Sequence, residues 1–363
     1  MKAPMPKSKA WKTELRSRLS MFSNLIFAGL VKNAGKTTAL NAVNDLFEDR
    51  TLGLTSIGYD GEAKDAIYHH PKPSISVRPG QLVLTAERFL SETSKNYEIL
   101  DSWGHHPQFG SWLILRITSP GDIRMAGPSS LSELLEGISR LRHFGAAQIH
   151  VDGALNRLSH ISLNSTLQLE TTNNLEILSS GIILSTGAAL GNTLKEVAER
   201  TQYSLELFEL PAYSVSVGSP SNPPQLDVPV NNNSFFYQGI WFPLPSFLWN
   251  QDLKTLLPSQ VEILYLKGAL TDSIYFALRA AGRLPQELIT RTPAHILLSP
   301  KVWSGLKSRG IRVKVLQRPN LLLLTLSPWH PLTPIPTELL AEALLPMVKV
   351  PLIDIQKQHL WLP

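Results

Sequence analysis

The stretch Ile26-Phe27-Ala28-Gly29-Leu30-Val31-Lys32-Asn33-Ala34-Gly35-Lys36-Thr37-Thr38 is the most informative part of this chain. It reads as a short apolar strand, a glycine-containing loop, the tripeptide Gly-Lys-Thr and the start of a helix expected over residues 38–48. That order of elements is typical of a phosphate-binding P-loop. The pattern G-x-x-x-x-G-K-[ST] places its first glycine at position 30, whereas this chain has Gly29, one residue early. The alternative interpretation is a glycine-rich turn that binds no ligand.

The chemistry of a nucleoside triphosphate matches these residue types. Exposed backbone N–H groups at a helix N-terminus present oriented dipoles to a concentrated negative charge. Lys36 adds a mobile positive charge for the β- and γ-phosphates, and the hydroxyl of Thr37 is placed to ligate Mg²⁺. The expected nucleotide-binding residues are Gly29, Lys32, Asn33, Ala34, Gly35, Lys36, Thr37 and Thr38.

A P-loop also needs acidic partners that orient the metal and position the attacking group. Asp152 ends the apolar strand predicted over residues 148–152, as a Walker-B-type carboxylate does. Asp60 follows the strand predicted over residues 54–59. We therefore expect Thr37, Asp60 and Asp152 at the metal, and Lys36 and Asp60 as the catalytic pair. In the alternative interpretation each aspartate belongs to an Asp-Gly turn after its strand.

Composition limits the classes of function. The chain has 363 residues, is 43% apolar and carries a formal net charge of +5. Six Lys or Arg and one Glu lie within residues 1–20, so this segment alone accounts for the +5, and the remaining 28 basic and 28 acidic residues cancel. Such a distribution argues against a nucleic-acid-binding surface. The chain has no cysteine and no run of about 18 apolar residues, so we expect a cytoplasmic protein without a membrane span.

Strand-like and helix-like patterns alternate up to about residue 213, which predicts a mostly parallel sheet covered by helices. The fold expected is therefore α/β, a P-loop NTPase-like sheet followed by a smaller α/β domain. The predicted organisation is a basic tail over 1–23, a nucleotide-binding domain over 24–213, a linker rich in Pro, Ser and Asn over 214–234, and the smaller domain, without an assigned role, over 235–363.

Beside the loop with its early glycine, four more stretches fall in a recognisable order over residues 24–205. They are Gly53-Leu-Thr-Ser-Ile-Gly-Tyr-Asp-Gly-Glu62, Ser119-Pro-Gly-Asp…Ala126-Gly-Pro128, Val151-Asp-Gly-Ala-Leu-Asn-Arg157 and Ile183-Leu-Ser-Thr-Gly-Ala188. Together they resemble the KamB-type reactivase subunit of lysine 5,6-aminomutase. The resemblance implies a protein that uses ATP and Mg²⁺, with a MutS-like ATPase subunit as partner. That pair restores an adenosylcobalamin-dependent aminomutase whose cofactor is damaged.

Two other interpretations remain open. The MobB-type GTP-binding protein of molybdenum cofactor synthesis has a loop similar to residues 32–37, but its first glycine stands where this chain has Leu30. It also has a Lys-His signature where this chain has Tyr59 and Asp60. GTP therefore stays a possible ligand. The second alternative is a subunit without turnover, in which the nucleotide only controls the affinity for a partner.

Overall fold

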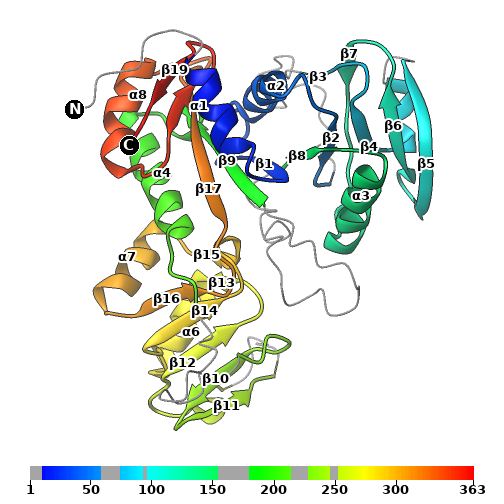
Figure 1. The fold of residues 1–363 in the computed structure, drawn as a ribbon. Coiled ribbons are helices and arrows are strands. Elements are labelled where there is room, and N and C mark those ends of the chain that lie inside the picture. Colours follow the sequence, from blue (N-terminus) through cyan, green and yellow to red (C-terminus); the bar gives the residue numbers. More distant parts are fainter. Residues whose placement is uncertain (1–9, 59–73, 93–95, 154–179, 214–227, 246–251) are drawn as a thin grey trace, which may run out of the picture. The chain divides into compact units, whose positions relative to one another are not determined.

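The computed structural model describes residues 10–58, 74–92, 96–153, 180–213, 228–245 and 252–363 (Figure 1). The chain divides into two compact units. Unit 1 comprises residues 1–202 and 320–363, and unit 2 comprises residues 203–319. Each unit has its own sheet, and we describe them separately.

The centre of unit 1 is a sheet in which ten strands of the described residues follow the order β19-β18-β17-β9-β1-β8-β2-β4-β6-β5. The strands from β18 to β4 in this order are parallel, while β19, β6 and β5 pair antiparallel. Their bounds are β1 Asn24–Gly29, β2 Leu52–Ser56, β4 Leu82–Ala86, β5 Tyr97–His106, β6 Gly110–Ile117, β8 Gln148–Asp152, β9 Ser180–Gly187, β17 Asn320–Ser327, β18 Leu352–Asp354 and β19 His359–Trp361. The expected α/β class with a mostly parallel sheet is thus confirmed.

Helices cover both faces of this sheet. Leu40 and Val43 of α2 (Lys36–Leu46) are buried together with Phe27, Leu52 and Leu54, which all point to one face. The intervening Gly53 faces the other way, because successive strand residues alternate between faces. There a Cβ at position 53 would lie 3.3 Å from Leu141 of α3 (Leu131–His143). Unit 1 also contains η1 (Glu87–Glu92), η3 (Ala188–Leu190), the first part of α4 (Leu194–Phe208), α8 (Thr337–Leu344), η5 (Leu345–Met347) and the small antiparallel pair β3 (Ile75–Val77) and β7 (Gly121–Ile123).

The N-terminal segment is not only a basic tail, as the sequence had suggested. Residues Ala10–Leu19 form helix α1, and its Trp11, Leu15 and Leu19 are buried in the core beside α2. Their spacing of four places them on one face of a helix. The side-chain amide of Gln148 donates to the backbone oxygen of Leu19 at 2.9 Å, which joins the helix end to β8. The predicted tail over 1–23 is therefore wrong for residues 10–23, because this apolar face packs on the sheet.

Unit 2 is a smaller α/β body with the strand order β11-β10-β12-β14-β16. Strands β12, β14 and β16 are parallel, and the hairpin β10–β11 joins β12 antiparallel. Buried side chains of α6 and α7 share a core with these strands. The bounds are β10 Ser234–Tyr237, β11 Ile240–Pro243, α5 Leu253–Leu256, β12 Ile263–Leu266, β13 Leu270–Thr271, α6 Asp272–Ala281, β14 Glu287–Thr290, η4 Pro293–His295, β15 Ile296–Leu297, α7 Pro300–Ser308 and β16 Arg312–Val315.

The order of the two units along the chain differs from the prediction. The second α/β body does not run from residue 235 to the C-terminus, since residues 320–363 return to the sheet of unit 1. Strand β17 pairs in parallel with β9, as Figure 1 shows for the orange and green strands. Unit 2 is therefore an insertion. The predicted linker over 214–234 lies mostly outside the described residues, and its last residue, Ser234, is already the first of β10.

Local predictions differ in a few places. The sequence pattern of residues 124–126 predicts a strand, whereas β7 ends at Ile123. The pattern of residues 86–94 predicts a helix, and the structure has the 3-10 turn η1 there. Ser130 precedes a helical pattern in the sequence and caps α3, since its hydroxyl accepts from the backbone N–H of Glu133 at 3.3 Å. In the part of the chain that the structure describes, the helices lack the length and apolar composition needed to cross a bilayer.

Candidate functional site

The loop between β1 and α2 has the backbone of a tight strand-to-helix connection. Gly35 adopts a left-handed conformation with φ 89°, and Asn33 has φ 64°. Both values fall in the region that favours Gly and Asn. The backbone N–H of Leu30 donates to the oxygen of Ser185 at 3.0 Å and thereby ties the loop to β9. Gly29 ends β1, and a Cβ there would lie 3.1 Å from the backbone oxygen of Val31, so the early glycine leaves room for the loop to fold back.

Helix α2 begins two residues earlier than predicted, at Lys36, so that Lys36, Thr37 and Thr38 form its first turn. The first turn holds no acidic residue, and Gly35 supplies no capping side chain. The first N–H groups of a helix have no partner within the helix, and they carry the positive end of its dipole. This helix end therefore favours an anion.

Lys36 meets Asp152 at the end of the neighbouring strand. The Nζ of Lys36 lies 2.9 Å from Oδ1 of Asp152, and both side chains are largely buried, with exposed fractions of 23% and 18%. Asp152 stands level with Phe27 of β1, and the N–H of Gly153 donates to the oxygen of Phe27 at 2.9 Å. The sequence singled out both residues separately, and the structure brings them together.

Strand β1 lies where the chain order reverses, with β8 and β2 on one side and β9 and β17 on the other. In open α/β sheets, ligands bind at the carboxyl ends of the strands at such a point. A Cβ at Gly35 would lie 3.1 Å from Cβ of Ser327, the last residue of β17. Ser327 could not be predicted from the sequence, because nothing local indicates that β17 returns to this sheet.

The sequence of residues 185–188, after a predicted strand, allows backbone groups for a nucleobase or a second ligand, but it favours an ordinary strand-to-helix turn. Their side chains are engaged in the core: Ser185 accepts from the hydroxyl of Thr325 at 2.8 Å, and the Thr186 hydroxyl lies 2.7 Å from that of Thr201. Gly187 lies against the backbone of Ser327. This segment thus fixes β9 to β17 and α4, while the oxygen of Ser185 holds the loop at Leu30.

On the other side, residues 125–128 cross the carboxyl end of β2. The hydroxyl of Ser56 accepts from the N–H of Gly127 at 2.8 Å, and the N–H of Gly58 donates to the oxygen of Pro128 at 3.0 Å. A Cβ at Gly127 would lie 1.6 Å from the oxygen of Ser56, so only glycine fits this close approach. The pattern Ala126-Gly-Pro128 was part of the family resemblance, and the structure gives it this place.

The other predicted acidic residue cannot be placed. Asp60 lies outside the described residues, as do the neighbouring Glu62 and, after Asp152, Arg157. The hydroxyl of Thr37 and the carboxylate of Asp152 are oxygen ligands of the kind that Mg²⁺ prefers. Among the described residues, three or more His, Cys, Asp or Glu side chains do not gather into a metal-binding group. Mg²⁺ does not need such a group, because it binds one or two protein oxygens together with phosphates and water.

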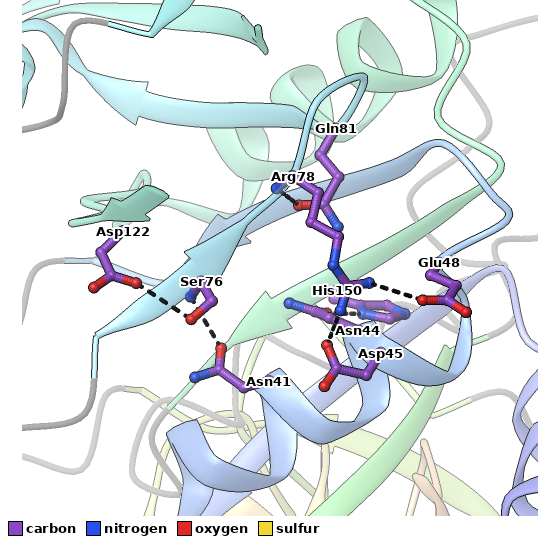
Figure 2. A network of polar contacts seen from close by, with 9 residues as sticks. All are labelled: Asn41, Asn44, Asp45, Glu48, Ser76, Arg78, Gln81, Asp122 and His150. Carbon is purple, nitrogen blue, oxygen red and sulfur yellow. Dashed lines mark hydrogen bonds and ion pairs between the residues drawn. The ribbon is translucent and has the colours of Figure 1, made fainter. Parts of the chain in front are cut away.

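A buried histidine lies beneath the site, between β8 and α2 (Figure 2). The ring nitrogens of His150 lie 2.6 Å from Oδ1 of Asn44 and 3.1 Å from Oε1 of Gln148. The rings of Phe27 and Phe47 contact it edge-on. Burial removes the water that would solvate an imidazolium ion, and this lowers the pKa of His150 to about 3.

This pKa predicts a loss of stability in mild acid. The unfolded chain takes up a proton at His150 below about pH 6.5, whereas the folded chain stays neutral there. The free energy of unfolding therefore falls as pH decreases from about 6.5 towards 3, by roughly 1.4 kcal/mol per pH unit, or about 2 kcal/mol at pH 5. Urea unfolding of the wild type and of His150→Gln at pH 7.5 and pH 5.0 measures this difference. Exposed His143→Gln is the control, and equal pH slopes in wild type and His150→Gln would contradict the prediction.

Comparison of this chain with protein-family models, with curated proteins and with solved structures finds no match in any of the three.

Proposed function

We propose that unit 1 binds a nucleoside triphosphate with Mg²⁺ at the carboxyl end of β1. The observation that carries this proposal is the ion pair of Lys36 and Asp152, 2.9 Å apart, at the uncapped N-terminus of α2. This ion pair brings together a cation, Lys36, that can neutralise phosphate and a carboxylate, Asp152, that can ligate a metal. A turn that only connects a strand to a helix does not need two charged side chains that are largely buried beside each other.

Each residue has a distinct role in this proposal. The N–H groups of the loop and of the first turn of α2 bind the phosphate oxygens. Lys36 exchanges the single charge of Asp152 for the larger charge of the β- and γ-phosphates. Thr37 and the released Asp152 are the residues that would hold Mg²⁺, which neutralises phosphate charge when it is bound. Asp60 remains the proposed partner of Lys36 in turnover, on sequence grounds alone.

The resemblance of the five stretches supports ATP as the nucleotide and an ATP-dependent reactivase role, with a MutS-like ATPase and a cobalamin-dependent aminomutase as partners. A pull-down from native extract with a non-hydrolysable ATP analogue tests this role. Recovery of such partners with the ATP analogue, but not with a GTP analogue, supports it. Recovery of molybdenum-cofactor proteins with the GTP analogue alone would move the chain to the competing family.

Nucleotide binding itself is tested by calorimetric titration of the full chain with ATP, ADP and GTP, each with Mg²⁺ and with EDTA. For the wild type we expect saturable binding that Mg²⁺ strengthens. For Asp152→Asn we expect the strengthening by Mg²⁺ to disappear, because an amide oxygen lacks the charge that attracts the cation. Binding in EDTA persists in that variant.

The outcomes separate the parts of the proposal. Wild-type protein that binds no triphosphate would refute it. Metal titration curves of Asp152→Asn that coincide with those of the wild type would remove Asp152 from the metal site and leave the phosphate-binding loop intact. Asp49→Asn, whose side chain is 56% exposed beyond the C-terminal end of α2, is the matched control for the loss of one carboxylate.

A further inference from the structure

The polar contacts of Figure 2 fix the direction in which β3 runs beside α2. The amide nitrogen of Asn41 donates to the oxygen of Ser74 at 2.9 Å, and the N–H of Ser76 donates to Oδ1 of Asn41 at 3.2 Å. One helical turn further along α2, Asp45 forms an ion pair with Arg78. Residue numbers rise together in both elements, so β3 and α2 run in the same direction.

Strand β7 is antiparallel to β3 and therefore runs back towards the N-terminus of α2. Ser76 is level with Asp122, and its hydroxyl donates to Oδ1 of that residue at 3.2 Å. Two residues beyond Asp122 the chain has advanced by about 6.6 Å. Along α2, the step from Asn41 back to Thr37 is about 6 Å. Strand β7 ends at Ile123, and continuing its direction by one residue places Arg124 about level with Thr37, the residue proposed to ligate the metal.

The residues after Arg124 fix its other side. Ser56 donates its hydroxyl proton to the oxygen of Met125 at 3.4 Å. Ser56 is the register partner of Asp152, and the N–H of Ile57 donates to the oxygen of Asp152 at 2.9 Å. Arg124 therefore lies between β7 and Met125. Met125 contacts the end of β2, the strand next to Asp152 of β8. Strand β7 lies about 4.8 Å from β3, on the side of β3 away from α2. The extended side chain of an arginine is longer than this strand spacing.

From this placement we infer that Arg124 contacts the terminal phosphate of the bound nucleotide and makes the site selective for a triphosphate over a diphosphate. The inference rests on the proposed function. Arg124 is exposed. A guanidinium stays charged at any physiological pH, and its planar donors match phosphate oxygens in pairs. The loop amides bind phosphates that ATP and ADP share, and Lys36 reaches the β-phosphate of either nucleotide as well as the γ-phosphate of ATP. Arg124 adds a contact to the γ-phosphate alone, which only ATP can make.

The test compares the affinities for a non-hydrolysable ATP analogue and for ADP, both with Mg²⁺. For Arg124→Ala we expect the affinity for the ATP analogue to fall at least tenfold and the affinity for ADP to change less than twofold. Arg124→Gln keeps the length of the side chain and should show the same selective loss. Arg116→Ala is the control and should leave both affinities unchanged. Arg116 lies on β6, where its Nη1 is 3.5 Å from Oε2 of Glu98.

The ratio of the two affinities is the decisive quantity, because a merely structural role of Arg124 lowers both equally. An unchanged ratio in Arg124→Ala and Arg124→Gln would overturn the inference. That failure is distinct from failure of the proposed function, in which the wild type itself binds neither nucleotide. If Arg124→Ala does not fold, as judged by thermal unfolding, the test uses the ratio of the affinities of Arg124→Gln for the ATP analogue and for ADP.

Discussion

Replacing Lys36 with alanine should lower the affinity for ATP and for ADP by about a hundredfold or more and abolish any hydrolysis. Lys36 is the only side chain of the first turn of α2 that carries a positive charge. Its removal also leaves Asp152, with an exposed fraction of 18%, without the cation 2.9 Å away. The negative charge of that carboxylate then faces the incoming phosphates, so the variant loses an attraction and gains a repulsion.

Calorimetric titration measures this loss, and two further variants identify its cause. Lys195→Ala removes the same charge from α4, where the side chain is 84% exposed, and should leave the affinity at the wild-type value. The double variant Lys36→Ala/Asp152→Asn also removes the negative charge at position 152, so we expect it to regain thermal stability without regaining the full affinity. Wild-type affinity in Lys36→Ala would show that the loop does not bind phosphate.

The central part of the site could be predicted from the sequence because its signals are local. The residues of the loop are contiguous, and β8 has the predicted bounds Gln148–Asp152. Parallel strands align their carboxyl ends, so an aspartate after a buried strand beside β1 must lie near the loop. Lys36 and Asp152 follow from that reasoning, and their ion pair confirms the proximity. ATP, Mg²⁺ and the partner proteins remain predictions.

Other parts could not be read in this way. Periodicity shows that residues 321–326 form a buried strand, but it does not say which strand pairs with it, so the return of β17 to β9 was missed. The placement of Arg124 depends on the register of β3 with β7, which is equally invisible in one sequence. Helix α1 is a different case. The spacing of Trp11, Leu15 and Leu19 is typical of one apolar helix face, but the many basic residues around them favoured the prediction of a solvated tail.

Gly187→Ala is the variant for which we expect the largest loss of stability, and it tests the return of β17 directly. A Cβ at position 187 would lie 1.9 Å from the backbone oxygen of Ser327, a contact that only a shift of a whole strand can relieve. Residues 181–187 of β9 pair with β17 over its length, so the shift would disturb a buried strand pair. We expect the free energy of unfolding to fall by about 3 kcal/mol or more.

Urea unfolding of Gly187→Ala measures that loss, with Gly268→Ala as the control. A Cβ at position 268 meets no atom within 4 Å, so the same chemical change there should cost little. A second effect follows because Ser327 also lies against Gly35. A Cβ added at Gly35 would lie 3.1 Å from the Cβ of Ser327. Displacing β17 therefore disturbs the phosphate-binding loop, and nucleotide affinity should fall together with stability. A stability within about 1 kcal/mol of the wild type would show that β17 does not pair with β9 in this register, and that residues 320–363 do not complete the sheet of unit 1.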